Sequence, residues 1–167
     1  MMNEEISNYV FPFFYRTNLK PFLISNRIYQ LRIRRSRKMK LLRYFFWVTD
    51  IGFILYWTIT FLHIIPDEYL FKDYKNPILS AWNWSFFPLD ILISITGFTS
   101  LYLYKKGKSA WSKMAIVSLV LTSCSGLQAI SFWVLRSDFD PSWWIPNLFL
   151  LVYPIFFLPG LFKENQI

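Results

Sequence analysis

Four long runs of apolar residues, separated by short polar segments, dominate the sequence. A helix of about 20 apolar residues crosses the roughly 30 Å hydrocarbon layer of a bilayer. Each run is long enough to cross once, so the pattern predicts an all-α fold, an integral membrane four-helix bundle. The runs extend over residues 44–66, 76–104, 114–135 and 141–162. The expected spans are about 44–65, 80–104, 114–135 and 143–162.

The distribution of charge excludes a soluble core built from these runs. Soluble domains carry about 25% charged residues, whereas the charged side chains inside the four runs are Asp50 and Asp90. A bundle of four spans uses residues 39–167 and leaves no room for a second folded domain. Residues 1–38 are then expected to form a basic cytoplasmic tail.

Two hypotheses concern this tail. The basic cluster at residues 30–40 is a topology signal, and the alternative is that it also binds anionic lipid headgroups. The second hypothesis concerns the gene. If Arg34 and Arg35 are encoded AGG-AGG, they form a ribosome-binding sequence a few codons upstream of Met39. Residues 1–38 would then precede the true start of the protein at Met39.

Lysine and arginine are sorted by loop, and this sorting predicts the orientation of the chain. All of them except Lys72, Lys75 and Arg136 lie before the first span, between the second and third, or after the fourth. Cytoplasmic loops of membrane proteins carry such an excess. The sorting also explains the net charge of +8 better than nucleic-acid binding does. We expect a bacterial plasma membrane protein with both termini in the cytoplasm, partnered by the lipid bilayer and not by nucleic acid.

Asp90 is the strongest pointer to a functional site. A carboxylate at the centre of a span costs roughly 2.5–3.5 kcal/mol on insertion scales, so it should face the bundle interior or a wet cavity. Pro88 lacks an N–H and leaves the carbonyl of Trp84 free near the acid. This face predicts a ligand site, and the alternative is a structural acid that is hydrogen-bonded within the bundle. Four polar or small residues share the face: Asn83, Asp90, Ser94 and Gly97.

Asp50 lies in the first span between two tryptophans, Trp47 at i−3 and Trp57 at i+7. A carboxylate beside aromatic faces attracts a lipophilic cation through charge pairing and cation–π interaction. The alternative is that both tryptophans face lipid or pack in the core. Helix rise places Asp50 about 11 Å from Arg43, on the inner side of the membrane midplane.

Other polar residues are expected at the depth of Asp90, in the outer half of the bundle. Counting about 1.5 Å per residue from the loop ends gives this depth for Asn83, His63, Gln128 and Asn147. Gln128 is expected to hydrogen-bond across the bundle, whereas His63 is more typical of a structural histidine at the interface. We therefore expect a pocket that is open to the exterior or the outer leaflet. Asp90 would form its floor, with Asp50 beneath.

The third span carries small residues along one side. Small residues let another helix approach closely, so packing within the bundle is the expected use of this face, and a homo-oligomer through it is the alternative. The residues are Ser118, Thr122, Ser125 and Ala129. The lone Cys124 excludes an internal disulfide and a multi-cysteine metal site. No metal and no cofactor is expected.

From Met39 onward the chain resembles the YvaD-type small membrane proteins of Bacillus and relatives. The resemblance covers most of residues 39–162 and implies a four-helix bacterial membrane protein without a particular activity. The runs that carry it are VTDIGFILYW, PDEYLFKDY, AWNWSFFPLD, SITGFTSLYLYKK, LTSCSGLQAISFW and WWIPNLFLL.

The general plan is also similar to the emopamil-binding and sigma-2 receptor group. The shared features are an acid in each of the first two helices, a basic inner loop, and a proline-rich last helix after a short acidic loop. This second resemblance implies binding of sterols or lipophilic amines in a bundle cavity, or isomerisation of sterol double bonds by buried acids. Asp50 and Asp90 would be the matching acids.

Three functions stay open. The first and favoured one is a bundle that binds or transports a small lipophilic or cationic ligand. The second is an isomerase-like enzyme that acts on a lipid or polyprenoid and needs both acids, and the third is a structural or partner-binding subunit. Because the sequence has no G-x-S-x-G, phosphate-binding glycine loop or H-E-x-x-H motif, no catalytic residue is assigned. The expected ligand-binding residues are Asp90, Asp50, Asn83, Ser94, Gln128, Asn147, Trp47 and Trp57.

Overall fold

A computed structural model describes residues 39–70 and 73–164 of the chain. All regular structure in these ranges is helical. From Leu42 onward the described residues belong to one compact unit. The predictions of a basic tail and of a start at Met39 concern residues 1–38, which lie outside the described ranges, and they stay predictions.

The described ranges contain four helical segments that are long and apolar enough to cross a membrane, which confirms the predicted all-α class and the four candidate spans. These segments are Met39–Phe61, Pro77–Lys105, Trp111–Leu135 and Pro141–Lys163. Met39–Phe61 is called the first helix below. The remaining elements are α2 (Asp67–Leu70), α3 (Pro77–Trp84), α4 (Phe87–Lys105), α5 (Trp111–Leu135) and α6 (Pro141–Glu164).

The second span consists of two helices rather than the single helix expected at 80–104. It is interrupted after Trp84 and resumes at Phe87. Pro88 favours the interruption, because its missing N–H costs least in the first turn of a helix, where Pro88 lies in α4. Helix α6, by contrast, continues through Pro146, Pro154 and Pro159. The Ser85 hydroxyl donates to the carbonyl of Trp82 at the break, over 2.6 Å. The interruption places Asp90 in the first turn of α4.

Three helices end at a residue in the left-handed conformation: His63 (φ 48°), Gly107 (φ 65°) and Ser137 (φ 54°). In each case the next residue's N–H donates to a carbonyl five residues back, as in a Schellman motif. These bonds join Ile64 to Ile59, Lys108 to Leu103 and Asp138 to Trp133. His63 therefore lies where the first helix ends, and its side chain is 70% exposed.

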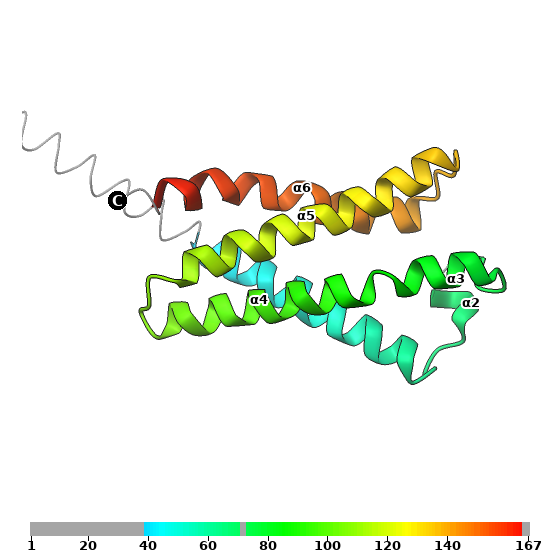
Figure 1. Ribbon diagram of the computed structural model, residues 1–167, viewed down its shortest axis with the longest axis horizontal. Helices are drawn as coiled ribbons and strands as arrows, with labels where there is room; N and C mark the ends of the chain where they lie inside the picture. The colour runs from blue at the N-terminus through cyan, green and yellow to red at the C-terminus, as the bar shows by residue number, and fades with distance from the viewer. Residues whose placement is uncertain (1–38, 71–72, 165–167) are drawn as a thin grey trace, which may run out of the picture. The chain divides into compact units, whose positions relative to one another are not determined.

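The helices from Leu42 onward pack in a ring. Helix α5 lies against both α4 and α6 (Figure 1). The first helix closes the ring between α4 and α6: the Ser94 hydroxyl of α4 donates to the carbonyl of Asp50 over 3.3 Å. On the other side, the ring of Phe45 stacks on Tyr153 of α6, with centroids 4.9 Å apart.

Polar side chains lie inside this bundle and large apolar side chains lie outside it. Buried hydroxyls come from the first helix, α4 and α5, including Thr60, Ser100 and Thr122. Leu55, Phe61, Ile95, Ile155 and Phe156 are exposed. Soluble proteins bury such side chains and rarely expose extended apolar surfaces. The arrangement is typical of helices that meet lipid on the outside and pack through small polar residues.

The small residues of α5 are buried within the chain. The Ser118 hydroxyl donates to the carbonyl of Ile93 in α4 over 3.3 Å, which joins the two helices closely. These side chains therefore pack within the described part of the chain, and the homo-oligomer stays a prediction. The four residues are Ser118, Thr122, Ser125 and Ala129.

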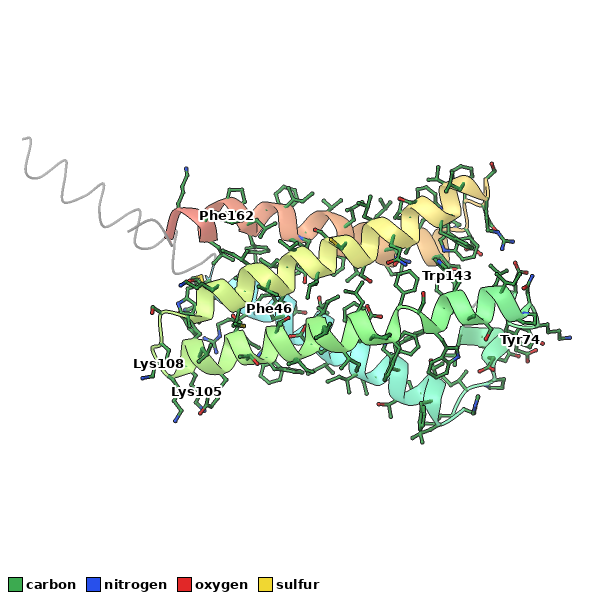
Figure 2. The ribbon with its side chains drawn as sticks, in the orientation of Figure 1. Phe46, Tyr74, Lys105, Lys108, Trp143 and Phe162 are labelled. Carbon is green, nitrogen blue, oxygen red and sulfur yellow. The ribbon has the colours of Figure 1, made fainter. Side chains whose placement is uncertain are left out.

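Three apolar side chains are fully buried within the bundle on the basic side of Asp90. They are Phe46 of the first helix, Ile93 of α4 and Leu119 of α5, and each is at most 1% exposed. Figure 2 labels Phe46 between the helices.

The two ends of the bundle differ in charge. The basic end contains Lys105, Lys106 and Lys108, and the guanidinium of Arg43 lies 5.5 Å from the centre of the Tyr104 ring there. The acidic end contains the segments around α2 and between α5 and α6. Figure 2 shows Lys105 and Lys108 at the first end and Tyr74 and Trp143 at the other. The acids of the acidic end are Asp67, Glu68, Asp73, Asp138 and Asp140.

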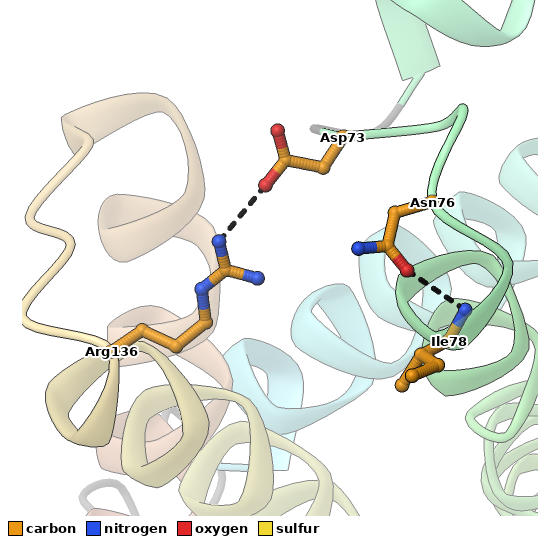
Figure 3. A network of polar contacts seen from close by, with 4 residues as sticks. All are labelled: Asp73, Asn76, Ile78 and Arg136. Carbon is orange, nitrogen blue, oxygen red and sulfur yellow. Dashed lines mark hydrogen bonds and ion pairs between the residues drawn. The ribbon is translucent and has the colours of Figure 1, made fainter.

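Two polar contacts order the acidic end (Figure 3). Arg136 Nη2 lies 3.0 Å from Asp73 Oδ2 and joins the end of α5 to the segment before α3. Asn76 caps α3, because its Oδ1 accepts a hydrogen bond from the Ile78 N–H over 3.0 Å. The cap satisfies one of the backbone donors that a helix leaves free at its start.

Because the Arg136 and Asp73 side chains are 37% and 42% exposed, we expect Asp73→Asn to lower the free energy of unfolding by less than about 1 kcal/mol. Asn76→Ala removes the cap and should cost about 1 kcal/mol or more. Thermal unfolding of the detergent-solubilised protein compares the two variants. A larger loss for Asp73→Asn than for Asn76→Ala would contradict the expectation.

Candidate functional site

A cavity of about 410 Å³ lies toward the acidic end of the bundle. Tyr69 of α2 and Trp143 at the start of α6 belong to its lining, which places it near that end. Ligand cavities are mostly apolar, with a few polar groups that fix orientation. Here the apolar part is largely aromatic, and the polar part consists of side chains from the first helix and from α3 to α6. The aromatic lining includes Tyr56, Trp57, Trp82, Phe86 and Trp133.

Asp90 lines this cavity and is held by two neighbouring helices. Its side chain is 4% exposed. Trp57 Nε1 of the first helix donates to Asp90 Oδ2 over 2.9 Å, and the Ser125 hydroxyl of α5 donates to Oδ1 over 3.1 Å. Both donors are neutral, so they orient the carboxyl group without supplying a positive charge. Within the described ranges, no lysine, arginine or histidine forms an ion pair with Asp90.

Asn83 and Trp133 bring further donors to the cavity. The Tyr56 hydroxyl donates to Asn83 Oδ1 over 3.1 Å, which leaves the amide nitrogen of Asn83 as a donor. Asn83 Nδ2 and Trp133 Nε1 are both buried, and neither has a hydrogen-bond partner in the described part of the chain. Both residues line the cavity. The site thus combines an acid with two donors that no acceptor in the described ranges satisfies.

Asp50 is sealed off from the cavity. It is 0% exposed and does not belong to the lining. Neither of its carboxyl oxygens has a hydrogen-bond partner among residues 39–70 and 73–164. The carboxyl group lies against Gly97, which follows Asp90 by seven residues, or about 10 Å along α4. Ser94 lies between the two acids and contacts the backbone of both. Its hydroxyl lies 3.0 Å from the Asp90 carbonyl and 3.3 Å from the Asp50 carbonyl.

The structure brings together half of the residues expected to contact a ligand. Trp57, Asn83 and Asn147 line the same cavity as Asp90. The side-chain amide of Asn147 already has one hydrogen-bond partner, since its Nδ2 donates to the Trp143 carbonyl over 2.7 Å. Ser94 is buried one turn beyond Asp90 and, like Asp50, does not belong to the lining.

Trp47 and Gln128 lie on the outside. Trp47 is 49% exposed and packs edge-on against Phe98, which agrees with the alternative that it faces lipid. Gln128 is exposed and does not line the cavity, contrary to the expected hydrogen bond across the bundle. The reason is the register of α5: Ala129 faces inward, and Gln128 lies about 100° away around the helix.

Sequence reasoning missed three residues of the site: Tyr56, Ser125 and Trp133. Ser125 was expected to serve packing, and its hydroxyl is the signal that could have identified it as a donor for a buried acid. Tyr56 neighbours Trp57, which was assigned. Trp133 carries no local signal, because its place in the cavity lining depends on how α3 and α5 pack.

Two comparisons place the chain among known proteins. Residues 42–167 match the family described as "Family of unknown function (DUF5360)". The chain is 56% identical over 128 residues to "Uncharacterized protein YvaD" of Bacillus subtilis (strain 168), covering 77% of this chain and 96% of that protein. No solved structure matches it. These matches confirm the YvaD-type resemblance, and neither supports the likeness to the emopamil-binding and sigma-2 receptor group. The chain belongs to the DUF5360 family.

Proposed function

We propose that the chain is a multi-pass protein of the bacterial plasma membrane that binds a small lipophilic cation in the cavity around Asp90. The observation that carries the proposal is the setting of Asp90, a buried acid that faces an aromatic cavity. An acid inside a membrane-spanning bundle is costly unless it has a partner. A lipophilic cation would supply the missing charge, and the aromatic faces would add cation–π attraction.

Membrane placement is supported by the distribution of side chains. Exposed apolar residues surround a polar interior in the described helices, and lipid favours that arrangement. The positive-inside rule assigns the basic end to the cytoplasm. Both termini would then be cytoplasmic, and the cavity would open toward the outer face of the membrane.

The other two functions have less support. An isomerase that uses both acids needs both carboxyl groups at one substrate, whereas Asp50 is sealed beneath the cavity that Asp90 lines. A partner subunit that docks through the small residues of α5 needs that face free, whereas those residues are buried within the chain. Ligand binding in the cavity requires neither a second carboxyl group at the ligand nor a free face on α5.

Replacing Asp90 with asparagine tests the proposal. Phenethyltrimethylammonium, a permanently charged lipophilic cation, is titrated into the purified protein in detergent and followed by calorimetry. We expect the wild-type protein to bind and Asp90→Asn to weaken binding by at least roughly 30-fold, because removing one member of a buried charge pair costs about 2–5 kcal/mol. Asn retains the size of the side chain, so the shape of the cavity is kept.

Glu68→Gln is the matched control. Glu68 is an exposed acid of α2 at the same end of the bundle and does not line the cavity. The Glu68→Gln variant should bind the cation with the same affinity as the wild-type protein. Equal affinities for wild type and Asp90→Asn, or no binding by the folded wild type, would refute the proposal.

A further inference from the structure

The two unsatisfied donors of the cavity say more about its ligand than Asp90 alone. Asn83 Nδ2 and Trp133 Nε1 are buried without a partner in the part of the chain that the structure describes. A buried donor without an acceptor has lost its hydrogen bond to water and gained none in return. Such groups are rare in folded proteins and call for a specific explanation. Both belong to residues that line the cavity of Asp90.

Packing fixes the Trp133 donor in place. The Trp133 ring is stacked on Trp143 with centroids 6.1 Å apart, and it meets Trp82 edge-on at 5.7 Å. Trp133 is 3% exposed, so its Nε1–H cannot turn toward solvent outside the cavity. The Asn83 amide is fixed by the Tyr56 hydroxyl at its oxygen. An acceptor for either donor therefore has to come from within the cavity.

The lining gives the cavity two chemically different polar ends. Arg136 does not contribute to them, because its guanidinium lies 5.6 Å from the Trp133 ring centre but is paired with Asp73 and does not belong to the lining. The lining itself has hydrogen-bond donors at Asn83 and Trp133 and an acid at Asp90. A ligand with a negative dipole at one end and a cation at the other matches this polarity.

We infer that the cavity takes an amphiphilic ammonium compound that also carries a hydrogen-bond acceptor, such as a carbonyl oxygen. The ammonium group lies at Asp90, and the acceptor lies at Asn83 Nδ2 and Trp133 Nε1. This inference rests on the proposed function, because the cation has to occupy the cavity first. It narrows the ligand class from any lipophilic cation to one with two polar groups.

Two matched probes test the inference on the wild-type protein. Phenacyltrimethylammonium carries a ketone where phenethyltrimethylammonium carries a methylene group, and both keep their charge at every pH. Calorimetric titration should give at least roughly fivefold tighter binding of the ketone, the gain expected from one net hydrogen bond of about 1 kcal/mol. Equal binding of the two probes would overturn the inference and leave the proposed function standing. If neither probe binds, both fail.

Variants assign the preference to the donors. The ketone preference is the dissociation constant of the phenethyl probe divided by that of the phenacyl probe. Trp133→Phe removes the N–H and keeps an aromatic ring, so this ratio should fall. It should approach one if the Trp133 donor provides most of the preference. Asn83→Leu should also reduce the preference. Trp144→Phe is the control, because Trp144 does not line the cavity and its Nε1 donates to the Asp138 carbonyl over 2.9 Å. A preference that survives both donor variants, or that disappears in Trp144→Phe alone, would overturn the assignment. The wild-type comparison decides the inference even if a variant fails to fold.

Discussion

Replacing Gly126 with alanine is expected to destabilise the bundle by about 3 kcal/mol, because the added methyl group would collide with the backbone of α6. A Cβ at this position would lie 2.6 Å from the Leu151 nitrogen and 2.7 Å from the Asn147 carbonyl oxygen. A backbone cannot rotate away as a side chain can, so α5 and α6 would have to separate. Ser123, whose hydroxyl donates to the Leu151 carbonyl over 3.1 Å, would lose that bond.

Thermal unfolding of the detergent-solubilised protein, followed by circular dichroism, measures this effect. Gly160→Ala is the matched control, because it adds the same methyl group to a helix at a position with no atom within 4 Å. Alanine is the better helix former by about 1 kcal/mol, so Gly160→Ala should be neutral or stabilising. If Gly126→Ala unfolds at the same temperature as Gly160→Ala, the close approach of α5 and α6 is wrong.

The second large loss of stability is expected for Gly97→Ala, and a second substitution should relieve it. A Cβ there would overlap the Asp50 carboxyl group, lying 2.7 Å from Cγ and 2.8 Å from Oδ1. Gly97→Ala should therefore cost about 2–3 kcal/mol as overpacking. Here the obstacle is a side chain of the first helix. The double variant Gly97→Ala with Asp50→Ala should recover most of the loss.

A double-mutant cycle makes this test quantitative. Asp50→Ala alone should be tolerated, because it removes a buried acid whose oxygens have no partner in the described ranges. The same Asp50→Ala change should not rescue Gly126→Ala, which meets a different helix. Absence of coupling between positions 50 and 97 would show that the two helices do not meet at this pair.

The four spans could be predicted because length and the absence of charge suffice to identify them. The break between α3 and α4 could not be placed in the same way. Pro88 indicated a free carbonyl, but whether a helix bends, breaks or continues at a proline depends on what satisfies the neighbouring backbone groups. Ser85 provides one of those bonds, to the Trp82 carbonyl.

Within the second span, spacing placed two site residues well. Asn83 and Asp90 were expected on one face because they are seven residues apart, and both line the cavity although the span is interrupted between them. Residue spacing does not determine how one helix is rotated about its own axis relative to its neighbours. Gln128 was therefore expected inside but is exposed, whereas Ser125, three residues earlier, binds Asp90. Position along the bundle was predictable from loop distances for the residues that line the cavity, and direction around each helix was not.

The buried residues on the basic side of Asp90 bear on how a ligand in the cavity could move. Ile93 and Leu119 are 0% exposed, and Asp50 is buried against Gly97. Under the proposed function, a ligand bound at Asp90 could pass toward the basic end only if the first helix parted from α4 where Asp50 meets Gly97. Transport would therefore require a rearrangement of the core that binding alone would not.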